Sequence, residues 1–279
     1  MDHTPSYYYK QFLPAEELSD AIECYWYFFA ESHSGTSLQT LIPGGRIEWI
    51  FSFQDPLRWL ISENDPGVCQ YGSFILGQRN RHFFAKPGEA TELWGIRFRP
   101  GGWGAFSRVP AFGILNTVQK AGEIFAKDIT KFERGLRTVP LTDRKIDMLD
   151  TELLKCRFSP AEEFAESLHL IDKVRNSSCE KNINELCFNS SIHYKKLERV
   201  FLSVVGYAPS TYRCILRFNR MLKKLSSSNL SLTKLALGEG YFDQSHFIRE
   251  FRRFAGTSPG QFNFRESRIS ALLIRHQPV

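Results

Sequence analysis

The sequence predicts an α+β fold, in which an N-terminal β-rich domain finished by helices precedes an all-α domain of two helix-turn-helix units joined by a linker helix. Three observations lead to this prediction. Aromatic, strand-like segments fill the first hundred residues, apolar residues recur at helical intervals from residue 121, and one helical pattern occurs twice near the end. The net charge also changes, from −4 over residues 1–180 to +10 over residues 181–279. A basic second domain suits a polyanionic partner.

The expected strands of the N-terminal domain are short and rich in aromatic residues. Turn-forming Gly, Pro, Asn and Asp clusters separate them at residues 43–45, 64–67 and 86–88. We expect a small antiparallel sheet or barrel. The predicted strands cover residues 22–29, 46–53, 57–61, 73–76 and 91–98.

Two interpretations stay open for the aromatic side chains of these strands. They line a cavity for an effector, or they form an ordinary core, which is the more common role of aromatic residues on strands. The residues concerned are Tyr25, Trp26, Trp49, Trp59, Trp94 and Phe98.

A cupin-like enzyme is the rival class for the N-terminal domain. His33, His82 and Glu92 are imaginable metal ligands, but the sequence has no closely spaced His pair with a nearby carboxylate. The glycine-rich run at residues 101–104 lacks the GxGxxG spacing of a phosphate-binding loop. We therefore expect no catalytic residue, no metal and no cofactor.

Helical periodicity over residues 121–136, 141–154 and 160–174 predicts helices that complete the N-terminal domain, residues 1–175. The polar run NSSCEKN, residues 176–182, contains almost nothing to bury and is the expected linker. The helix-turn-helix domain then spans residues 183–264, and a C-terminal tail covers residues 265–279.

The stretch GYFDQSHFIREFRRFAGTSP, residues 240–259, has the pattern of a turn followed by a recognition helix. Gly240 permits a sharp turn, and Asp243 can cap the helix that follows. One face of that helix carries Phe247, Phe251 and Phe254 at buried spacing, while the other faces are polar and basic. Alone, this pattern also fits any amphipathic helix with a solvated basic side.

The same pattern occurs fifty residues upstream, which strengthens the interpretation. Before the recognition helix the interval is forty-nine, so the two turns differ in length by one residue. Two copies of one helix-turn-helix unit are therefore predicted. The fifty-residue pairs are Leu197 with Phe247, Arg199 with Arg249, Phe201 with Phe251, Gly206 with Gly256, Pro209 with Pro259, and Tyr212 with Phe262.

Two further helices complete the expected domain. Residues 213–225 form an amphipathic helix that joins the two units. Residues 230–239 form the scaffold helix of the second unit, with Ser231 as a candidate cap.

Together, the two units and the string LALGEGYFDQSHFIREFRRFAGTSPGQF resemble the DNA-binding domain of AraC/XylS-type bacterial transcription regulators. The first unit departs from the family pattern, because Ser191 stands where the family usually has Gly and His193 where it usually has a Ser cap. The N-terminal part resembles an uncharacterised β-rich domain found ahead of such modules, through Tyr25-Trp26, residues 43–45 and residues 95–102. The resemblance implies that this part senses an effector or mediates dimerisation.

The recognition helices supply the predicted base-reading residues. Gln suits adenine and Arg suits guanine in the major groove, so Gln244 and Arg249 are the strongest candidates. The second unit contributes Gln244, Ser245, His246 and Arg249, and by resemblance the first contributes Tyr194, Lys195, Glu198 and Arg199. Phosphate contacts are expected from Arg217, Arg220, Arg252 and Arg253.

Double-stranded DNA is the expected partner, and a small-molecule effector, RNA polymerase and a second copy of the chain stay open as others. The six cysteines show no CxxC pair and are expected to be reduced. The N-terminus has no signal-peptide pattern, and no stretch has membrane-spanning length, so a cytoplasmic protein is expected. The alternative function is a protein-interaction module whose helix-turn-helix units no longer read DNA.

Overall fold

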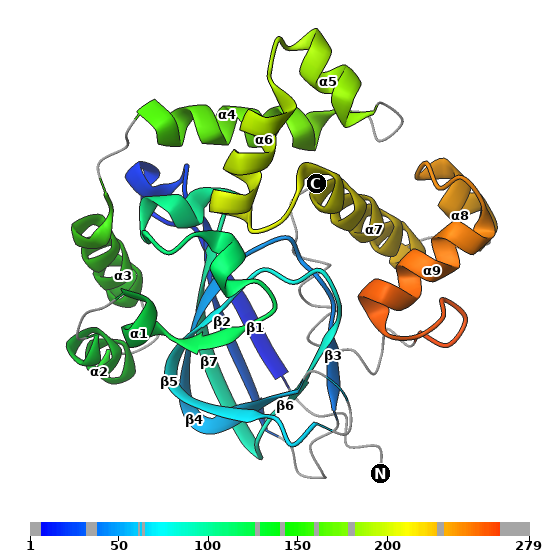
Figure 1. Cartoon of the computed structure of the whole chain (residues 1–279). Helices are drawn as coiled ribbons and strands as arrows, with labels where there is room; N and C mark the ends of the chain where they lie inside the picture. Colours follow the sequence, from blue (N-terminus) through cyan, green and yellow to red (C-terminus); the bar gives the residue numbers. More distant parts are fainter. Residues whose placement is uncertain are drawn as a thin grey trace.

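The computed structural model describes residues 7–31, 38–60, 62, 65–125, 129–139, 143–158, 162–177, 182–227 and 232–262. Within these residues an eight-stranded sheet curves into a barrel-like domain, with helices on one side of it and further helices across one end (Figure 1). The α+β prediction is confirmed. The expected Ser231 cap and the C-terminal tail lie outside the described residues.

The strands pair antiparallel in the order β1-β2-β7-β4-β5-β8, and β6 joins β4 to β3. Their bounds are β1 Tyr7–Phe12, β2 Ile22–Glu31, β3 Gln39–Leu41, β4 Glu48–Leu60, β5 Val68–Leu76, β6 Phe83–Lys86, β7 Ala90–Phe98 and β8 Val118–Lys120. The segments expected as two strands, 46–53 and 57–61, are one strand, β4. Its pairing with β5 shifts register between Ser52 and Leu57, so a bulge accommodates Pro56 without ending the strand.

Alternation along the strands divides the aromatic residues between two cores. Trp26 and Trp59 belong to a cluster inside the barrel with Phe28, Ile50 and Phe74. The opposite face of the sheet forms a second cluster that the helices α1 to α3 cover. That second cluster contains Tyr25, Trp49, Trp94 and Phe98.

The helices that cover the sheet are α1 Ala121–Phe125, α2 Thr130–Thr138 and α3 Asp143–Cys156. The segment expected as one helix over residues 121–136 is therefore two. Phe125 of α1 and Phe132 of α2 pack against the ring of Trp49, with ring centres 4.6 and 5.4 Å apart. Short 3-10 turns complete the domain at η1 Glu16–Leu18, η2 Gly102–Ala105 and η3 Ala111–Ile114.

Of the remaining helices, α4, α5 and α6 lie over one end of the barrel, and α7, α8 and α9 lie to its right in the view of Figure 1. They are α4 Glu162–Asn176, α5 Ile183–Asn189, α6 Tyr194–Val200, α7 Pro209–Ser227, α8 Leu232–Gly238 and α9 Gln244–Ala255, with a π-helical turn, η4 Phe201–Val205, after α6. Leu170, Ile171 and Val174 of α4 share one core with α5, α6, α7 and α9. Although α4 precedes the expected linker, it packs with the helices that follow it.

The barrel and the helical domain are in direct contact. Gly45 lies against the rings of Tyr207 and Tyr212 with a φ of +74°. Gly206 has a φ of +102°, and a Cβ there would lie 3.0 Å from the carbonyl oxygen of Ala111 in η3. The positive φ favours glycine at both positions, and at Gly206 the close approach of Ala111 favours it as well. The interface therefore holds the helical domain firmly on the end of the barrel.

Candidate nucleic-acid interface

Helix α9 is built as an amphipathic recognition helix. Phe247, Phe251 and Phe254 are fully buried, and the last two contact Phe218 of α7 with ring centres 5.4 and 5.1 Å apart. At its start, Asp243 Oδ1 accepts a hydrogen bond from the backbone N–H of His246 at 2.6 Å. Gly256 ends the helix in the left-handed region. The predicted cap and apolar face are both present.

The outer face of α9 carries side chains with free hydrogen-bonding groups. Gln244, Ser245, Arg249 and Arg252 are exposed. In the described part of the chain, none of these four side chains has an ion pair or a hydrogen bond. They present a guanidinium, an amide and a hydroxyl on a helix whose opposite face is fixed, which is the chemistry that major-groove reading requires.

His246 differs from its neighbours because it turns back toward the protein. It is only partly exposed, its ring meets the ring of Tyr241 edge-on at 5.5 Å, and its Nε2 lies 3.9 Å from Glu250 Oε2. Among the predicted readers of the second unit, it is therefore the most constrained.

Arg217, a predicted phosphate ligand, instead makes contacts within the protein. Its Nη2 lies 2.7 Å from Glu250 Oε2, and the two side chains are 11% and 9% exposed. Its guanidinium also stacks on the ring of Tyr241, 4.2 Å from the ring centre, and donates to the carbonyl of Gly240 at 3.3 Å. Arg217 thus connects α7 to both the turn and the recognition helix.

The other predicted phosphate ligands are placed differently from one another. Arg220 pairs with Glu239 at the end of α8, at 3.2 Å, and Glu239 also pairs with Lys224 at 2.6 Å. Arg253 donates from Nε to the carbonyl of Asn80 in the barrel, at 3.2 Å. Arg252 is exposed and, within the described ranges, has no partner for its guanidinium.

The first recognition helix, α6, also has a buried face and an exposed face. Leu197 is buried behind it, and Lys195 and Arg199 are exposed with no side-chain partner in the part of the chain that the structure describes. Tyr194 is half-buried, and its hydroxyl donates to Glu198 at 3.3 Å, so these two predicted readers contact each other.

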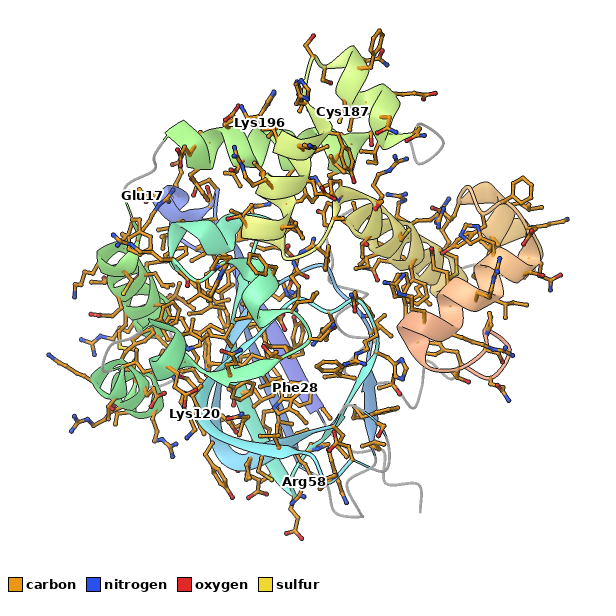
Figure 2. All side chains as sticks on the ribbon, in the orientation of Figure 1. Glu17, Phe28, Arg58, Lys120, Cys187 and Lys196 are labelled. Carbon is orange, nitrogen blue, oxygen red and sulfur yellow. The ribbon has the colours of Figure 1, made fainter. Side chains whose placement is uncertain are left out.

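The turn before α6 follows the departures seen in the sequence. Ser191 adopts a φ of +52°, a region that glycine enters more easily, and the side chain of His193 makes no capping hydrogen bond. Lys196 anchors the helix to α4 through a 2.5 Å contact between its Nζ and Glu166 (Figure 2).

Equivalent residues of the two units occupy equivalent places. Phe201 and Phe251 are both fully buried, and Gly206 and Gly256 both have positive φ, at +102° and +78°. One difference follows the first helix: residues 201–205 form a π-helical turn, whereas α9 stays α-helical to Ala255.

Sequence reasoning missed the two buried acids of the second unit, Glu239 and Glu250. Glu239 pairs with Arg220 and Glu250 pairs with Arg217, two arginines that the sequence predicts to contact phosphate. The available signal was an isolated acidic residue within a strongly basic helix, since Glu250 is surrounded by Arg249, Arg252 and Arg253.

The candidate metal ligands of the N-terminal domain do not come together. Glu92 lies beside Tyr27 and Gln54, His82 lies against α9, and His33 is outside the described residues. No group of three or more His, Cys, Asp or Glu side chains in the described ranges could hold a metal ion. Five cysteines are described, and no disulfide joins any two of them. In the described segments, no helix combines the length and apolarity that crossing a membrane requires.

Comparison with known families matches two separate parts of the chain to different models. Residues 10–120 match a domain of unknown function (DUF6597), and residues 186–265 match a helix-turn-helix domain. The HTH-type transcriptional regulator ArgR of Pseudomonas aeruginosa is 29% identical over 76 residues, which are 27% of this chain and 23% of ArgR. The HTH-type transcriptional regulator MtrA of Neisseria gonorrhoeae is 30% identical over 95 residues, 34% of this chain and 32% of MtrA.

The chain therefore aligns with about a quarter to a third of the length of these curated relatives. Among solved structures, ToxT of Vibrio cholerae is similar with a TM-score of 0.46 and 8% identity, over 96% of this chain and 98% of ToxT. A ToxT structure bound to an unsaturated fatty acid is similar with a TM-score of 0.45 and 8% identity, over 93% of this chain and 95% of that chain.

The exposed face of α9, its buried aromatic face and the duplicated unit together define a helix-turn-helix DNA-binding domain of the kind found in bacterial transcription regulators. Over residues 186–265 the domain is of the AraC type. The resemblance inferred from the sequence is confirmed.

Proposed function

We propose that this protein regulates transcription by inserting α6 and α9 into successive major grooves of DNA. The observation that carries the proposal is a contrast on α9. Phe247, Phe251 and Phe254 are fully buried on one face, whereas Gln244 and Arg249 are exposed on the other and have no partner among the described residues. A helix fixed from behind presents its donors in a constant geometry, which sequence discrimination requires. Two such helices on one chain can span one helical turn of DNA, about 34 Å.

The two units contribute unequally in this proposal. Arg249 reads guanine and Gln244 reads adenine, with Ser245 and His246 beside them, while Lys195 and Arg199 extend from the first unit. Tyr194 and Glu198 are restrained by their mutual hydrogen bond. Arg252 supplies the phosphate contact of the second unit, whereas Arg217, Arg220 and Arg253 reach phosphate only by leaving their internal partners.

The N-terminal domain acts as the regulatory part in this proposal. Three contacts join the segment 78–82 of the barrel to the DNA-binding domain. Gln78 accepts a 3.0 Å hydrogen bond from the buried Tyr207 hydroxyl, Asn80 accepts one from Arg253, and His82 packs so tightly on Gly256 that a Cβ there would lie 2.7 Å from its Nε2. A change in this segment therefore reaches α9 directly.

The proposed role needs neither catalysis nor a metal or cofactor. A small-molecule effector, RNA polymerase and a second copy of the chain are its proposed partners besides DNA, and light scattering of the purified protein with and without DNA measures the last of these.

Selection of bound fragments from random DNA tests the proposal. We expect enrichment of a motif in two parts, spaced by about one helical turn, and binding that weakens steeply with salt. Failure to enrich any motif, with no salt-dependent binding, would instead favour the protein-interaction alternative.

A further inference from the structure

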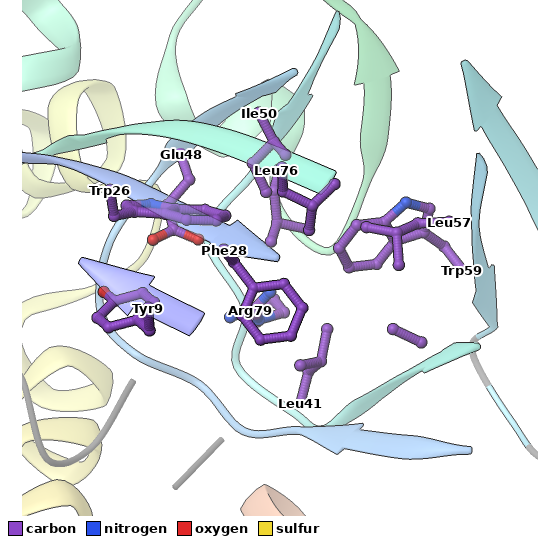
Figure 3. Close-up of a pocket in the computed structure, with 12 residues that line it drawn as sticks. Tyr9, Trp26, Phe28, Leu41, Glu48, Ile50, Leu57, Trp59, Leu76 and Arg79 are labelled. Atoms are coloured by element: carbon purple, nitrogen blue, oxygen red, sulfur yellow. The ribbon is translucent and has the colours of Figure 1, made fainter. Parts of the chain in front are cut away.

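The barrel contains an apolar cavity between its strands. Side chains of β1 to β7 line it, among them Trp26, Phe28 and Trp59 (Figure 3). The enclosed space amounts to about 40 Å³ in this conformation, so it suits a group of a few heavy atoms, and a larger ligand has to displace side chains. Most of the lining is apolar, and its charged side chains are those of Arg79 and Glu48.

Arg79 is a buried cation that forms no ion pair with any residue the structure describes. Its side chain lies in the barrel wall with the residue 5% exposed, and only Nη2 has a protein partner, the carbonyl of Ile42 at 3.3 Å. Its Nε and Nη1 are buried without any partner. Leaving charged donors unsatisfied in a dry interior is among the most unfavourable arrangements a protein can contain. Burial accordingly lowers the pKa of Arg79 from its ordinary value, although a guanidinium stays charged in proteins.

The neighbouring acids compensate this charge only in part. Glu48 also lines the cavity and attracts Arg79, but each acid forms its ion pair with another arginine. Glu48 pairs with Arg97 at 2.7 Å, and Glu23 pairs with Arg46 at 2.5 Å. Among the described residues of this buried cluster, three arginines therefore face two glutamates, and Arg79 is the one in excess.

Every other orphaned polar atom of the cavity lining is also a donor. The indole N–H groups of Trp26 and Trp59 are buried with no hydrogen-bond partner. A site that offers donors, an unpaired positive charge and apolar walls is complementary to an anion with an apolar body.

We propose that this cavity binds a compact organic anion, a carboxylate attached to a short apolar group, and that Arg79 pairs with its carboxylate. The inference rests on the regulatory role proposed for the N-terminal domain and names the class of effector. The apolar part lies among Phe28, Leu57 and Leu76, and the indole of Trp26 or Trp59 contributes a further donor.

The position of Arg79 connects this site to the DNA-binding domain. It lies between Gln78, which binds Tyr207, and Asn80, which binds Arg253. An anion that draws the guanidinium further into the cavity shifts the backbone that carries both contacts. The backbone of residues 78–80 then has one position without the ligand and another with it. The ligand favours the position that it binds more tightly, and α9 shifts with that backbone.

Thermal unfolding and calorimetric titration of the full chain without DNA test the site. The probes are acetate, butyrate and benzoate, with acetamide, butyramide and benzamide as uncharged controls of the same shape. We expect at least one carboxylate to raise Tm and to bind saturably, and its amide to bind at least tenfold more weakly. Equal binding of acid and amide, or no binding of any acid at concentrations on the order of 10 mM, would overturn the proposal.

Two variants sharpen the result. Arg79→Met removes the charge and keeps the length, so it should weaken carboxylate binding about tenfold or more while leaving the ligand-free Tm unchanged or higher. Trp59→Phe keeps an aromatic wall and removes one donor, and it should weaken binding less. Carboxylate binding that Arg79→Met leaves unchanged would refute the assignment, and if that variant does not fold, acid–amide discrimination in the wild type and Trp59→Phe decides.

DNA binding is measured separately, on the motif selected from random DNA. Loss of the proposed DNA function appears as no binding with or without carboxylate. Failure of the present inference appears as DNA binding in a protein that no carboxylate stabilises.

Discussion

Arg217 of α7 and Glu250 of α9 form a buried ion pair, with 2.7 Å between Nη2 and Oε2. The pair fixes the recognition helix to the helix that joins the two units, and the ring of Tyr241 covers the guanidinium. Arg217, which the sequence predicts to contact phosphate, instead holds α9 in place.

Glu250→Gln should destabilise the protein by about 3 kcal/mol, because it leaves Arg217 buried without a counter-ion. Urea unfolding followed by circular dichroism measures the change. The double variant Arg217→Met/Glu250→Met should recover part of the loss, since it removes both charges. Strictly additive losses would show that the two side chains are not coupled.

Arg249→Ala should weaken binding to the selected DNA motif by about 1–3 kcal/mol and change binding to random DNA little, because a base contact carries the sequence information. Gel-shift titrations on both DNAs measure the difference. Lys223→Ala on α7 is the matched control and should leave specificity unchanged. Equal losses on the two DNAs for Arg249→Ala contradict the reader assignment.

Arg252→Ala should weaken binding to every DNA sequence alike and reduce the slope of log K against log salt by about 1, as expected for one lost phosphate contact. Titrations at several salt concentrations give the slope. Arg217→Met/Glu250→Met is the comparison, and it should keep the wild-type slope because Arg217 is held by Glu250. A reduced slope in that double variant would show that Arg217 does contact phosphate.

Tyr207→Phe should destabilise the contact between the domains by about 1–2 kcal/mol, because it leaves the buried Gln78 oxygen without its donor. Hydrogen exchange should then become faster over residues 78–82 and in α9. Tyr71→Phe, at an exposed tyrosine of β5, is the control and should leave both regions unchanged. Unaltered exchange in α9 would mean that this contact does not connect the domains.

Stability should fall as the pH rises from 9 to 11. Burial raises the pKa of the thiols of Cys24 and Cys214 to about 11 from an ordinary value of 9.0. The unfolded chain therefore loses these protons first, so the contribution is complete below pH 9 and is lost as the pH approaches 11, at about 2–3 kcal/mol per thiol. Urea unfolding across this range measures it, and Cys214→Ala should show a smaller alkaline loss. An identical pH dependence in that variant would refute the role of this thiol.

Local patterns in the sequence were sufficient to predict much of the local structure of the helix-turn-helix domain. Asp243 caps α9, and Gly206 and Gly256 adopt positive φ at the ends of equivalent segments. These features depend on the backbone preferences of a few neighbouring residues, which is why spacing and residue type predict them. The fifty-residue repeat added the pairing of Phe201 with Phe251, and both are buried.

Strand boundaries were predicted less well, for a physical reason that β4 illustrates. Pro56 looks like a strand break in the sequence, but β4 changes partners along its length, pairing with β7 over Glu48–Ser52 and with β6 over Arg58–Leu60. A bulge between these stretches accommodates the proline. Whether a proline ends a strand depends on partners far away in the chain.

The sequence by itself determined the helix-turn-helix units and the resemblance they carry, because helical periodicity and turn chemistry act over a few residues. Only the tertiary structure decided which charges stay available. It pairs Arg217 with Glu250, directs Arg253 to Asn80 and buries Nε and Nη1 of Arg79 without a hydrogen-bond partner among the described residues. Partners separated by 33 to 173 residues are set by packing. A charge's role depends on that packing, since burial determines whether it needs a partner.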